Sequence, residues 1–522
     1  ADFIKHVKNI AIDEISQNIR FTSSKECKVI GSNQEDIFNG LRQLVNECDK
    51  VVVCDASIDQ TTIDFLETAR PDEQLNIIEQ VPKNTGRECH IYTERADFLT
   101  KSKLELEDGG KVWLAVESAN KAEVLAEMFK DYKLISITSK NSKNKEIKKF
   151  LENVNDESLK YDLVIASPAI SSGVSVEHDV PHFTMIAGLA SGHSICFSDF
   201  AQMLGRVRYV KNMHVCLQKN NHRFEHVTTS SILTGLKQAA ALEGSTIKEN
   251  DYTRFKAHID IVEQEYRADF ANGFVWFMQY YCFEIKAGKV SSPNYVLNET
   301  MKNITKDLKE KYRHGIKIAK KISKDEAKKL DEKQSLTDDE EKELIAYRLR
   351  HSLGFDVQHD INDTDLDMFE NLASVDRFAR ILGLTHNNDE SEMNIALRKF
   401  EKAQVKACSD IFEGIDFAKI RQQDCEIIFD RISSNDTRFL YSTLKLIPSA
   451  YGKWQEDKSG NLKPYPVPKI KTKPVAAVLE KFGLSWRRSG SGATGEKYYK
   501  VNESDLERMK FYAESRYKKA PI

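Results

Sequence analysis

The chain has 522 residues, of which 40% are hydrophobic and 30% are charged, and its formal net charge is −3 at pH 7. At roughly 150 residues per domain, this length predicts about three domains. No apolar run approaches the roughly 20 residues of a membrane span, and no signal-peptide pattern is visible. The composition therefore argues against a membrane protein, and nearly neutral charge means that any nucleic-acid surface must be local.

The cysteines are scattered and form no C-x-x-C pair. This distribution is typical of reduced thiols and argues against a disulfide framework or a zinc site. The nine are Cys27, Cys48, Cys54, Cys89, Cys196, Cys216, Cys282, Cys408 and Cys425.

The first predicted strand, residues 4–12, ends at two acidic residues, Asp13 and Glu14. α/β nucleotide-binding domains place a metal-linked acid and a water-orienting carboxylate at such a strand end. An ordinary acidic strand terminus explains the pair equally well.

A second apolar strand is predicted at 50–54, between helices at 34–48 and 60–68. Its continuous β-branched run predicts a parallel strand that is buried on both faces. The strand runs into a polar segment made of Asp55, Ala56 and Ser57.

Proline and glycine between residues 70 and 87 mark a domain boundary, after which strands and helices alternate again. This alternation predicts a second α/β domain, closed by its last strand. The predicted strands are 89–92, 111–118, 134–138, 162–166, 185–189 and 214–217, and the helices between them include 119–129 and 145–153.

Residues 167–176 follow one of these strands and contain small hydroxyl residues and a glycine. Backbone N–H groups in such a segment can approach a phosphate or a nucleic-acid backbone. The candidates are Ser167, Ser171, Ser172 and Gly173.

Residues 200–208 lie on the helix that follows the strand 185–189 and contain Gln202, Gly205, Arg206 and Arg208. Two arginine side chains can bind the oxygens of a transferred phosphoryl group. Alone, this spacing is explained more often by a solvated helix face.

In this order, the motifs resemble those of superfamily 2 helicases. The resemblance covers about residues 1–220 and is greatest to herpesvirus-type origin-binding proteins and to plasmid and phage replication helicases. Asp13–Glu14 is similar to the Walker B pair, and residues 55–57 are similar to the Ser-Ala-Thr motif. Residues 113–118 are similar to the strand that opens the second RecA-like domain. Residues 167–176 are similar to the fifth motif, and residues 202–208 are similar to the sixth.

The resemblance implies ATP and Mg²⁺ as cofactors, with Asp13 holding the metal through its water shell and Glu14 orienting the attacking water. Arg206 and Arg208 would stabilise charge on the γ-phosphate, and Gln202 would lie near the nucleotide. Coupling to ATP is implied for Asp55, Ala56, Ser57, Gly173 and Gly205, and nucleic-acid contact for Ser118, Ser167, Ser171 and Ser172.

The chain departs from the family pattern in two places. The sixth motif usually has its second arginine where this chain has Tyr209, so the identity of the arginine finger is open. No G-x-x-x-x-G-K-[ST] phosphate loop precedes Asp13 or occurs elsewhere. We therefore expect the carboxyl-terminal portion of a longer replication protein, which by itself is a poor ATPase and needs its upstream part.

The rest of the chain, from residue 222 to about 455, has a helical pattern. Aromatic residues gather at 270–283, where core packing explains them better than a base-stacking platform. A charged segment at 306–329 is a solvated helix or, less favoured, a DNA-binding stripe. Residues 456–473 are typical of a linker.

The last segment combines a helix at 474–482, strands at 484–488 and 497–501, and a helix at 503–517. This order predicts a winged-helix-like module, although a small structural cap is an equal alternative. Basic side chains on the hairpin could follow a phosphate backbone, namely Arg487, Arg488, Lys497 and Lys500.

The sequence thus predicts an α/β fold of RecA-like helicase domains with helical and winged-helix-like additions. The expected function is that of an ATP-dependent DNA helicase or translocase in plasmid, phage or viral replication, with DNA and other replication proteins as partners, no membrane partner, and a location in the cytoplasm or the host-cell interior. A non-catalytic origin-binding initiator and an RNA helicase are the alternatives. The predicted domains are 1–80 (partial RecA-like), 81–221 (second RecA-like), 222–455 (helical), 456–473 (linker) and 474–522 (winged-helix-like).

Overall fold

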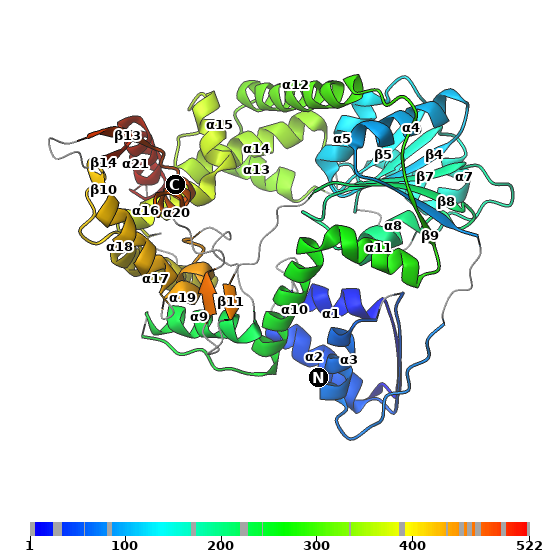
Figure 1. Cartoon of the computed structure of the whole chain (residues 1–522), viewed down its shortest axis with the longest axis horizontal. Coiled ribbons are helices and arrows are strands. Elements are labelled where there is room, and N and C mark those ends of the chain that lie inside the picture. Colours follow the sequence, from blue (N-terminus) through cyan, green and yellow to red (C-terminus); the bar gives the residue numbers. More distant parts are fainter. Residues whose placement is uncertain are drawn as a thin grey trace. The chain divides into compact units, whose positions relative to one another are not determined.

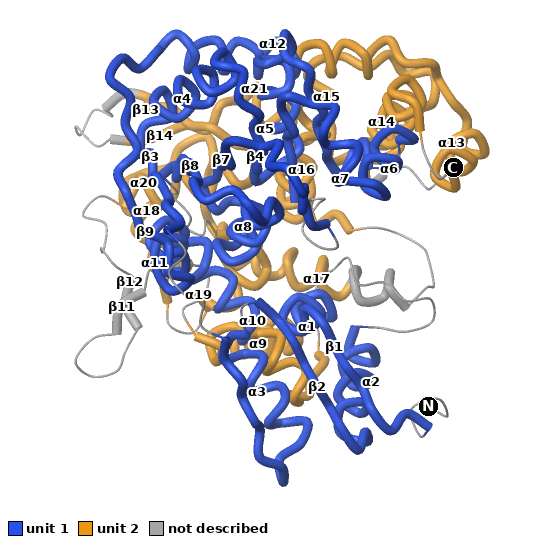
Figure 2. The backbone as a smooth tube through the Cα atoms, turned by 90° about the vertical axis from the view of Figure 1, so that its right-hand side faces the viewer, with its two compact units in different colours: residues 1–222, 258–309 blue, residues 223–257, 310–522 orange. Residues whose placement is uncertain are grey.

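The structure is a computed structural model, and it forms two compact units (Figure 2). Unit 1 comprises residues 1–222 and 258–309, and unit 2 comprises residues 223–257 and 310–522. The chain therefore passes between the units three times, after residues 222, 257 and 309. The described residues are 6–23, 34–56, 58–80, 86–142, 144–168, 174–219, 228–242, 244–333, 336–385, 392–434, 437–447, 454–456, 462–464, 471–491 and 497–518.

Unit 1 is built around a seven-stranded sheet with the strand order β5-β6-β4-β7-β8-β3-β9, in which every neighbouring pair is parallel. The predicted mixed α/β fold with a parallel sheet is confirmed. The strands are β3 (Glu88–Tyr92), β4 (Val112–Val116), β5 (Leu134–Ile137), β6 (Leu163–Ala166), β7 (Met185–Ala190), β8 (Asn212–Leu217) and β9 (Glu284–Ala287).

The prediction that the strand 214–217 closes the sheet is wrong. Strand β3 pairs with β8, and β9 pairs with β3 beyond it, so β9 forms the edge. This edge strand comes from the region that was predicted to be helical. Its four residues, half of them charged, carry too little apolar periodicity to indicate a strand.

Helices cover both faces of the sheet (Figure 1). Because successive side chains of a strand point to opposite faces, Val112 and Leu114 pack with α4 (Arg95–Glu107), α5 (Ala119–Met128) and the start of α12 (Val296–Ile318). Trp113 and Ala115 pack on the other face with α6 (Lys145–Glu152), α8 (Phe197–Leu204) and α11 (Phe270–Tyr280). The short helix α7 (Val154–Ser158) follows α6.

Helix α11 shows which of the aromatic residues at 270–283 belong to the core. Phe270, Phe274 and Phe277 are buried on the α8 side, which confirms core packing for them. Trp276 is 60% exposed and stacks on exposed Tyr280.

Residues 6–80 of unit 1 form the two-stranded parallel sheet of β1 (Asn9–Asp13) and β2 (Lys50–Cys54), with helices α1 (Ile15–Ser23), α2 (Gln34–Glu47) and α3 (Gln60–Ala69). The prediction that the strand 50–54 is buried on both faces is wrong. Alternate residues are exposed, and Val52 is 58% exposed, because the described residues cover only one face of this sheet.

Unit 2 is mainly helical but contains two small sheets. Strands β10 (Ile420–Arg421), β14 (Lys497–Val501) and β13 (Trp486–Ser491) form one, and β11 (Trp454–Glu456) and β12 (Leu462–Pro464) form the other. Strands β10 to β12 therefore lie in segments that were predicted to be helical or linker. The helices that lie wholly or partly in this unit are α9 (Thr229–Ala241), α10 (Asp251–Ala268), α12, α13 (Lys324–Asp331), α14 (Asp338–Leu353), α15 (Asp363–Glu370), α16 (Leu372–Ile381), α17 (Glu392–Phe412), α18 (Gln422–Ser433), α19 (Arg438–Thr443), α20 (Thr472–Lys481) and α21 (Glu503–Lys518).

The described part of the chain contains no helix that combines the length and the apolar character needed to span a membrane. All eight cysteines within it are free thiols.

Candidate functional site

Two acidic residues lie at neighbouring strand ends in the first part of unit 1. Asp13 ends β1 and pairs in register with Cys54, so Asp55 follows at the same edge. The Asp13 carboxylate accepts a hydrogen bond from the backbone N–H of Glu14 at 3.1 Å. The Asp55 carboxylate accepts one from the backbone N–H of Ser16 at 2.9 Å. These bonds join the two strand ends to the beginning of α1.

Glu14 lies in the turn between β1 and α1 and has an unusual backbone conformation, with φ of 53°. A non-glycine residue in this left-handed region carries a cost of about 1–2 kcal/mol, and such residues concentrate at functional sites. Its side-chain Oε2 is buried and has no hydrogen-bond partner among the described residues. Burial raises the pKa of the Glu14 carboxyl, the charge of Asp55 raises it further, and Arg206 opposes both.

The two arginines of the segment 202–208 are positioned by the segment 174–176. Val176 and Val207 form a parallel bridge, flanked by hydrogen bonds from Val176 N to Arg206 O at 2.8 Å and from Arg208 N to Val176 O at 3.1 Å. These bonds join the two segments that resemble the fifth and sixth helicase motifs.

The side chains of the two arginines differ in burial. Arg206 is 8% exposed and donates from Nη1 to the carbonyl oxygen of Val174 at 3.3 Å. Burial and the neighbouring charge of Arg208 lower the pKa of the Arg206 guanidinium, whereas Glu14 raises it. Arg208 is exposed and donates from Nε to Ser175 Oγ at 3.1 Å.

A pocket of about 220 Å³ brings these side chains together. One wall is apolar and comes from α11 and the segment after it, where the Tyr281 hydroxyl donates to the carbonyl oxygen of Ala56. The polar wall carries three guanidinium groups and one carboxylate. Among its lining residues are the predicted residues Glu14, Ala56, Gln202, Gly205, Arg206 and Arg208, together with Arg87, Phe277, Met278, Tyr281 and Phe283.

Side chains of α1 link the first 80 residues to α8 beside the pocket. Gln17 donates from Nε2 to Gln202 Oε1 at 2.9 Å. Arg20 forms an ion pair with Asp59 at 2.8 Å and approaches Asp199 at 4.0 Å. Gln17 and Arg20 were not predicted as site residues, since polar residues on a short amphipathic helix carry no local signal of a distant partner.

Glu117, directly after β4, is a third residue that was not predicted from the sequence. Its buried carboxylate accepts from Ser191 N and Gly192 N at 2.9 Å each and from Ser191 Oγ at 2.6 Å, and it pairs with Lys121. Burial acts to raise its pKa, but the bonds from Lys121 and Ser191 hold that pKa below its usual value. Glu117 therefore fixes the loop between β7 and α8. The position of this acidic residue directly after an apolar strand is the sequence pattern from which Glu117 could have been predicted.

The remaining predicted residues that the structure describes do not line this pocket. Ser118 caps α5, where its Oγ accepts from Lys121 N at 3.3 Å. Ser167 is buried, and its backbone N–H donates to Ile137 O at 2.9 Å. The basic residues of the hairpin are in unit 2, namely Arg487, Arg488, Lys497 and Lys500. The side chain of Lys497 lies outside the described residues. The predicted residues Ser57, Ser171, Ser172 and Gly173 also lie outside them.

The residues of the pocket fit a nucleotide with its metal. Guanidinium groups bind phosphate oxygens, and an apolar, aromatic wall suits a base or sugar face. The described residues contain no group of three side chains that could hold a metal ion. Magnesium bound to nucleotides takes one or two carboxylates together with phosphates and water, and Asp13 beside Glu14 provides such a carboxylate.

No protein-family model matches the chain. Over 220 residues the chain is 26% identical to "Uncharacterized putative helicase R8" of Acanthamoeba polyphaga mimivirus, a match that covers 41% of this chain and 20% of that protein. The matched region thus spans a fifth of the relative's length. This weak similarity makes the chain helicase-like, whereas closeness to herpesvirus-type origin-binding proteins stays a prediction.

Solved structures of helicases align with the chain at low similarity. Saccharomyces cerevisiae Dbp5 bound to RNA and ADP BeF3 aligns with a TM-score of 0.33 and 11% identity, over 58% of this chain and 63% of Dbp5. The yeast DEAD-box splicing factor Prp28 aligns with a TM-score of 0.22 and 13% identity, over 48% of this chain and 54% of Prp28.

Proposed function

We propose that this chain is part of an ATP-dependent DNA helicase or translocase of superfamily 2 type, and that its pocket binds the phosphate end of the nucleotide. The supporting observation is the convergence at one pocket of Glu14, Ala56 and the segment 202–208, which are far apart in the sequence. An ordinary acidic strand end and an ordinary solvated helix would not require their side chains to meet.

In this proposal, Glu14 orients the water that attacks the γ-phosphate, and its raised pKa suits a group that handles a proton during hydrolysis. Asp13 holds Mg²⁺ through its water shell, and the metal would neutralise phosphate charge. Of the two arginines, Arg206 is the better placed to stabilise negative charge on the γ-phosphate, because its guanidinium is buried and donates a hydrogen bond to the carbonyl oxygen of Val174.

Coupling between nucleotide and nucleic acid would pass through the contacts beside the pocket. Gln17 reaches Gln202 from α1, and Tyr281 reaches the Ala56 carbonyl from the end of α11. A nucleotide that draws Glu14 toward Arg206 would also shift these contacts. Such a shift is the kind of closure that links hydrolysis to movement in motor proteins.

The test is nucleic-acid-stimulated ATP hydrolysis by the full-length gene product. Arg206→Ala should lower the hydrolysis rate by about a hundredfold or more, the range seen for loss of an arginine finger or of one charge-stabilising donor. The matched control is Arg348→Ala, which removes an exposed arginine of unit 2 that pairs with Asp331. The control should hydrolyse ATP as the unaltered protein does.

Parallel reactions with duplex DNA, single-stranded DNA and single-stranded RNA separate the substrates. Stimulation by DNA supports the proposal, and stimulation by RNA alone would replace it with an RNA helicase. A protein that binds DNA but hydrolyses no ATP under any of these conditions would instead be a non-catalytic initiator.

A further inference from the structure

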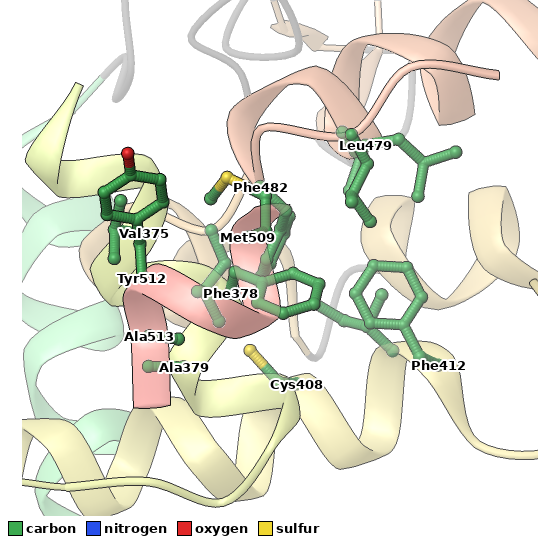
Figure 3. Packing of buried hydrophobic residues seen from close by; sticks show 14 of the residues in the cluster. Val375, Phe378, Ala379, Cys408, Phe412, Leu479, Phe482, Met509, Tyr512 and Ala513 are labelled. Atoms are coloured by element: carbon green, nitrogen blue, oxygen red, sulfur yellow. The ribbon is translucent and has the colours of Figure 1, made fainter. Parts of the chain in front are cut away.

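The small sheet of unit 2 has one face turned to the core. In the order β10-β14-β13, Ile420 pairs with Tyr499, and Trp486 pairs with Val501. Ile420 and Val501 are fully buried, and Trp486 stacks on Tyr499 with ring centroids 4.5 Å apart. Figure 3 shows part of the same core, where Phe482 after α20 lies near Phe412 of α17, and their rings meet edge to face at 5.4 Å.

The opposite face of this sheet is basic. Since side chains alternate along a strand, it carries Arg421 of β10, Tyr498 and Lys500 of β14, and Arg487 of β13. We call these four residues the outer face. Arg487 and Lys500 are a directly opposed cross-strand pair of like charge, an arrangement that destabilises a sheet. The stability of the sheet therefore does not explain why two cations lie opposite each other.

Few acidic groups offset this charge. Lys500 pairs with Glu503 at 2.6 Å, and Glu503 also feels the charge of Arg487. Arg487 and Arg488 are exposed, and neither forms an ion pair with any residue that the structure describes. Exposed Lys419 lies 5.7 Å from the ring of Tyr498 and extends the basic character at the rim.

The sequence around this face has the same bias. Between residues 463 and 500 there are nine basic residues and two acidic ones, in a chain whose net charge is −3. The acidic residues are Glu480 and Glu496, and the basic ones are Lys463, Lys469, Lys471, Lys473, Lys481, Arg487, Arg488, Lys497 and Lys500. Such local asymmetry is the electrostatic footprint of a polyanion partner.

The element order narrows the kind of polyanion. The chain runs α17, β10, α18, α19, the strand pair β11 and β12, α20, β13 and β14, and the middle strand of the sheet β10-β14-β13 is β14. Apart from the insertion of α19, β11 and β12, this order of helix, strand, two helices and a hairpin, with the first strand beside the last, resembles that of a winged-helix domain. The predicted module at 474–522 would thus extend upstream to include α17, β10 and α18.

We propose that the outer face binds the phosphate backbone of duplex DNA, with Arg487 and Lys500 on neighbouring phosphates. A pair of opposed cations on neighbouring strands matches a duplex backbone, whereas single-strand sites rely on stacked aromatic platforms. This site is distinct from the nucleotide pocket of the proposed function and does not depend on ATP.

The test measures binding of the full chain, without ATP, to a fluorescent duplex DNA of mixed sequence over a series of salt concentrations. The double variant Arg487→Ala/Lys500→Ala should bind about tenfold more weakly, and its plot of log K against log salt should be shallower by about two, one for each lost phosphate contact. The control Lys402→Ala/Lys510→Ala also removes two exposed lysines of unit 2 and should leave affinity and slope nearly unchanged.

Three further binding measurements accompany this test. Two use the unaltered chain with single-stranded DNA and with phosphatidylserine vesicles, and the third uses the Arg206→Ala variant with duplex DNA. Duplex binding that survives Arg206→Ala supports the proposal even if no ATPase is found, so the two proposals fail separately. An unchanged affinity in the hairpin variant, an equal loss in the control, or a preference for single strands or vesicles over duplex DNA would overturn it. Circular dichroism of both variants shows whether they are folded.

Discussion

Glu14 is held in a state that costs the folded protein stability. Its backbone has positive φ, its Oε2 is buried without a partner among the described residues, and its carboxylate lies near Asp55. A carboxyl whose pKa is raised by folding is stabilised in its protonated form. The folded state therefore loses stability as pH rises from the unfolded value, about 4.3, through the raised value.

This balance leads to a prediction for Glu14→Gln. Hydrolysis by the full-length protein should fall by about a hundredfold or more, since a positioned proton acceptor is lost. The free energy of unfolding of the variant should not be lower than that of the unaltered protein at pH 7. Between pH 4 and pH 7 the stability of the variant relative to the unaltered protein should increase, because glutamine does not titrate. Urea unfolding at both pH values measures this, with Glu67→Gln on the exposed side of α3 as the control.

If Glu14→Gln were destabilising by the same amount at both pH values, Glu14 would be a structural residue whose negative charge the fold does not oppose. That result would remove the electrostatic argument for its catalytic role.

Some site residues could be predicted from sequence and others could not. Glu14 and Arg206 were predictable because each lies at a strand end or helix end with a recognisable local pattern. Gln17 was not, since its role depends on a partner 185 residues away. Trp276 shows the same limit, because the aromatic spacing of α11 does not indicate which face meets the core.

Among the elements, α8 and α11 set the shape of the pocket, and their contact depends on a glycine. A Cβ at Gly273 of α11 would lie 2.5 Å from the ring of Phe197 in α8, closer than the two groups can approach. Both helices contribute residues to the pocket, namely Gln202 and Phe277 among others.

Two helical glycines therefore make a matched pair. Gly40→Ala in α2, where nothing lies within 4 Å of the new Cβ, should stabilise by up to about 1 kcal/mol through helix propensity. Gly273→Ala has the same propensity gain but should destabilise by about 1–3 kcal/mol, because α8 and α11 must separate. Urea unfolding of both variants measures the difference, and a stabilising Gly273→Ala would contradict this packing.

Element prediction failed where packing, not local pattern, decides the outcome. The alternation of apolar runs and amphipathic helices was enough to predict most strands of the large sheet. Strands β9 and β10 are too short for any periodicity, and they exist because β3 and β14 offer them an edge. The burial of β2 was predicted wrongly, since an apolar run does not reveal how many layers cover it.

At the scale of the whole molecule, the chain does not divide into consecutive domains. Residues 258–309 return to unit 1 and complete its sheet and the apolar wall of the pocket, after residues 223–257 have contributed to unit 2. Sequence order favours contiguous domains, and the helical pattern from residue 222 to about 455 does not indicate the crossings after residues 257 and 309. The pocket of Glu14 and Arg206 is contained in unit 1, and the basic outer face is contained in unit 2.

The central claim, that the pocket of Glu14 and Arg206 receives the phosphates of ATP, is tested most directly by an experimental structure of the full-length gene product with ADP, beryllium fluoride and Mg²⁺. We predict the beryllium fluoride within hydrogen-bond distance of Arg206 or Arg208, with Glu14 facing it. A nucleotide bound elsewhere, with both arginines unchanged and Glu14 still buried away from it, would contradict the account.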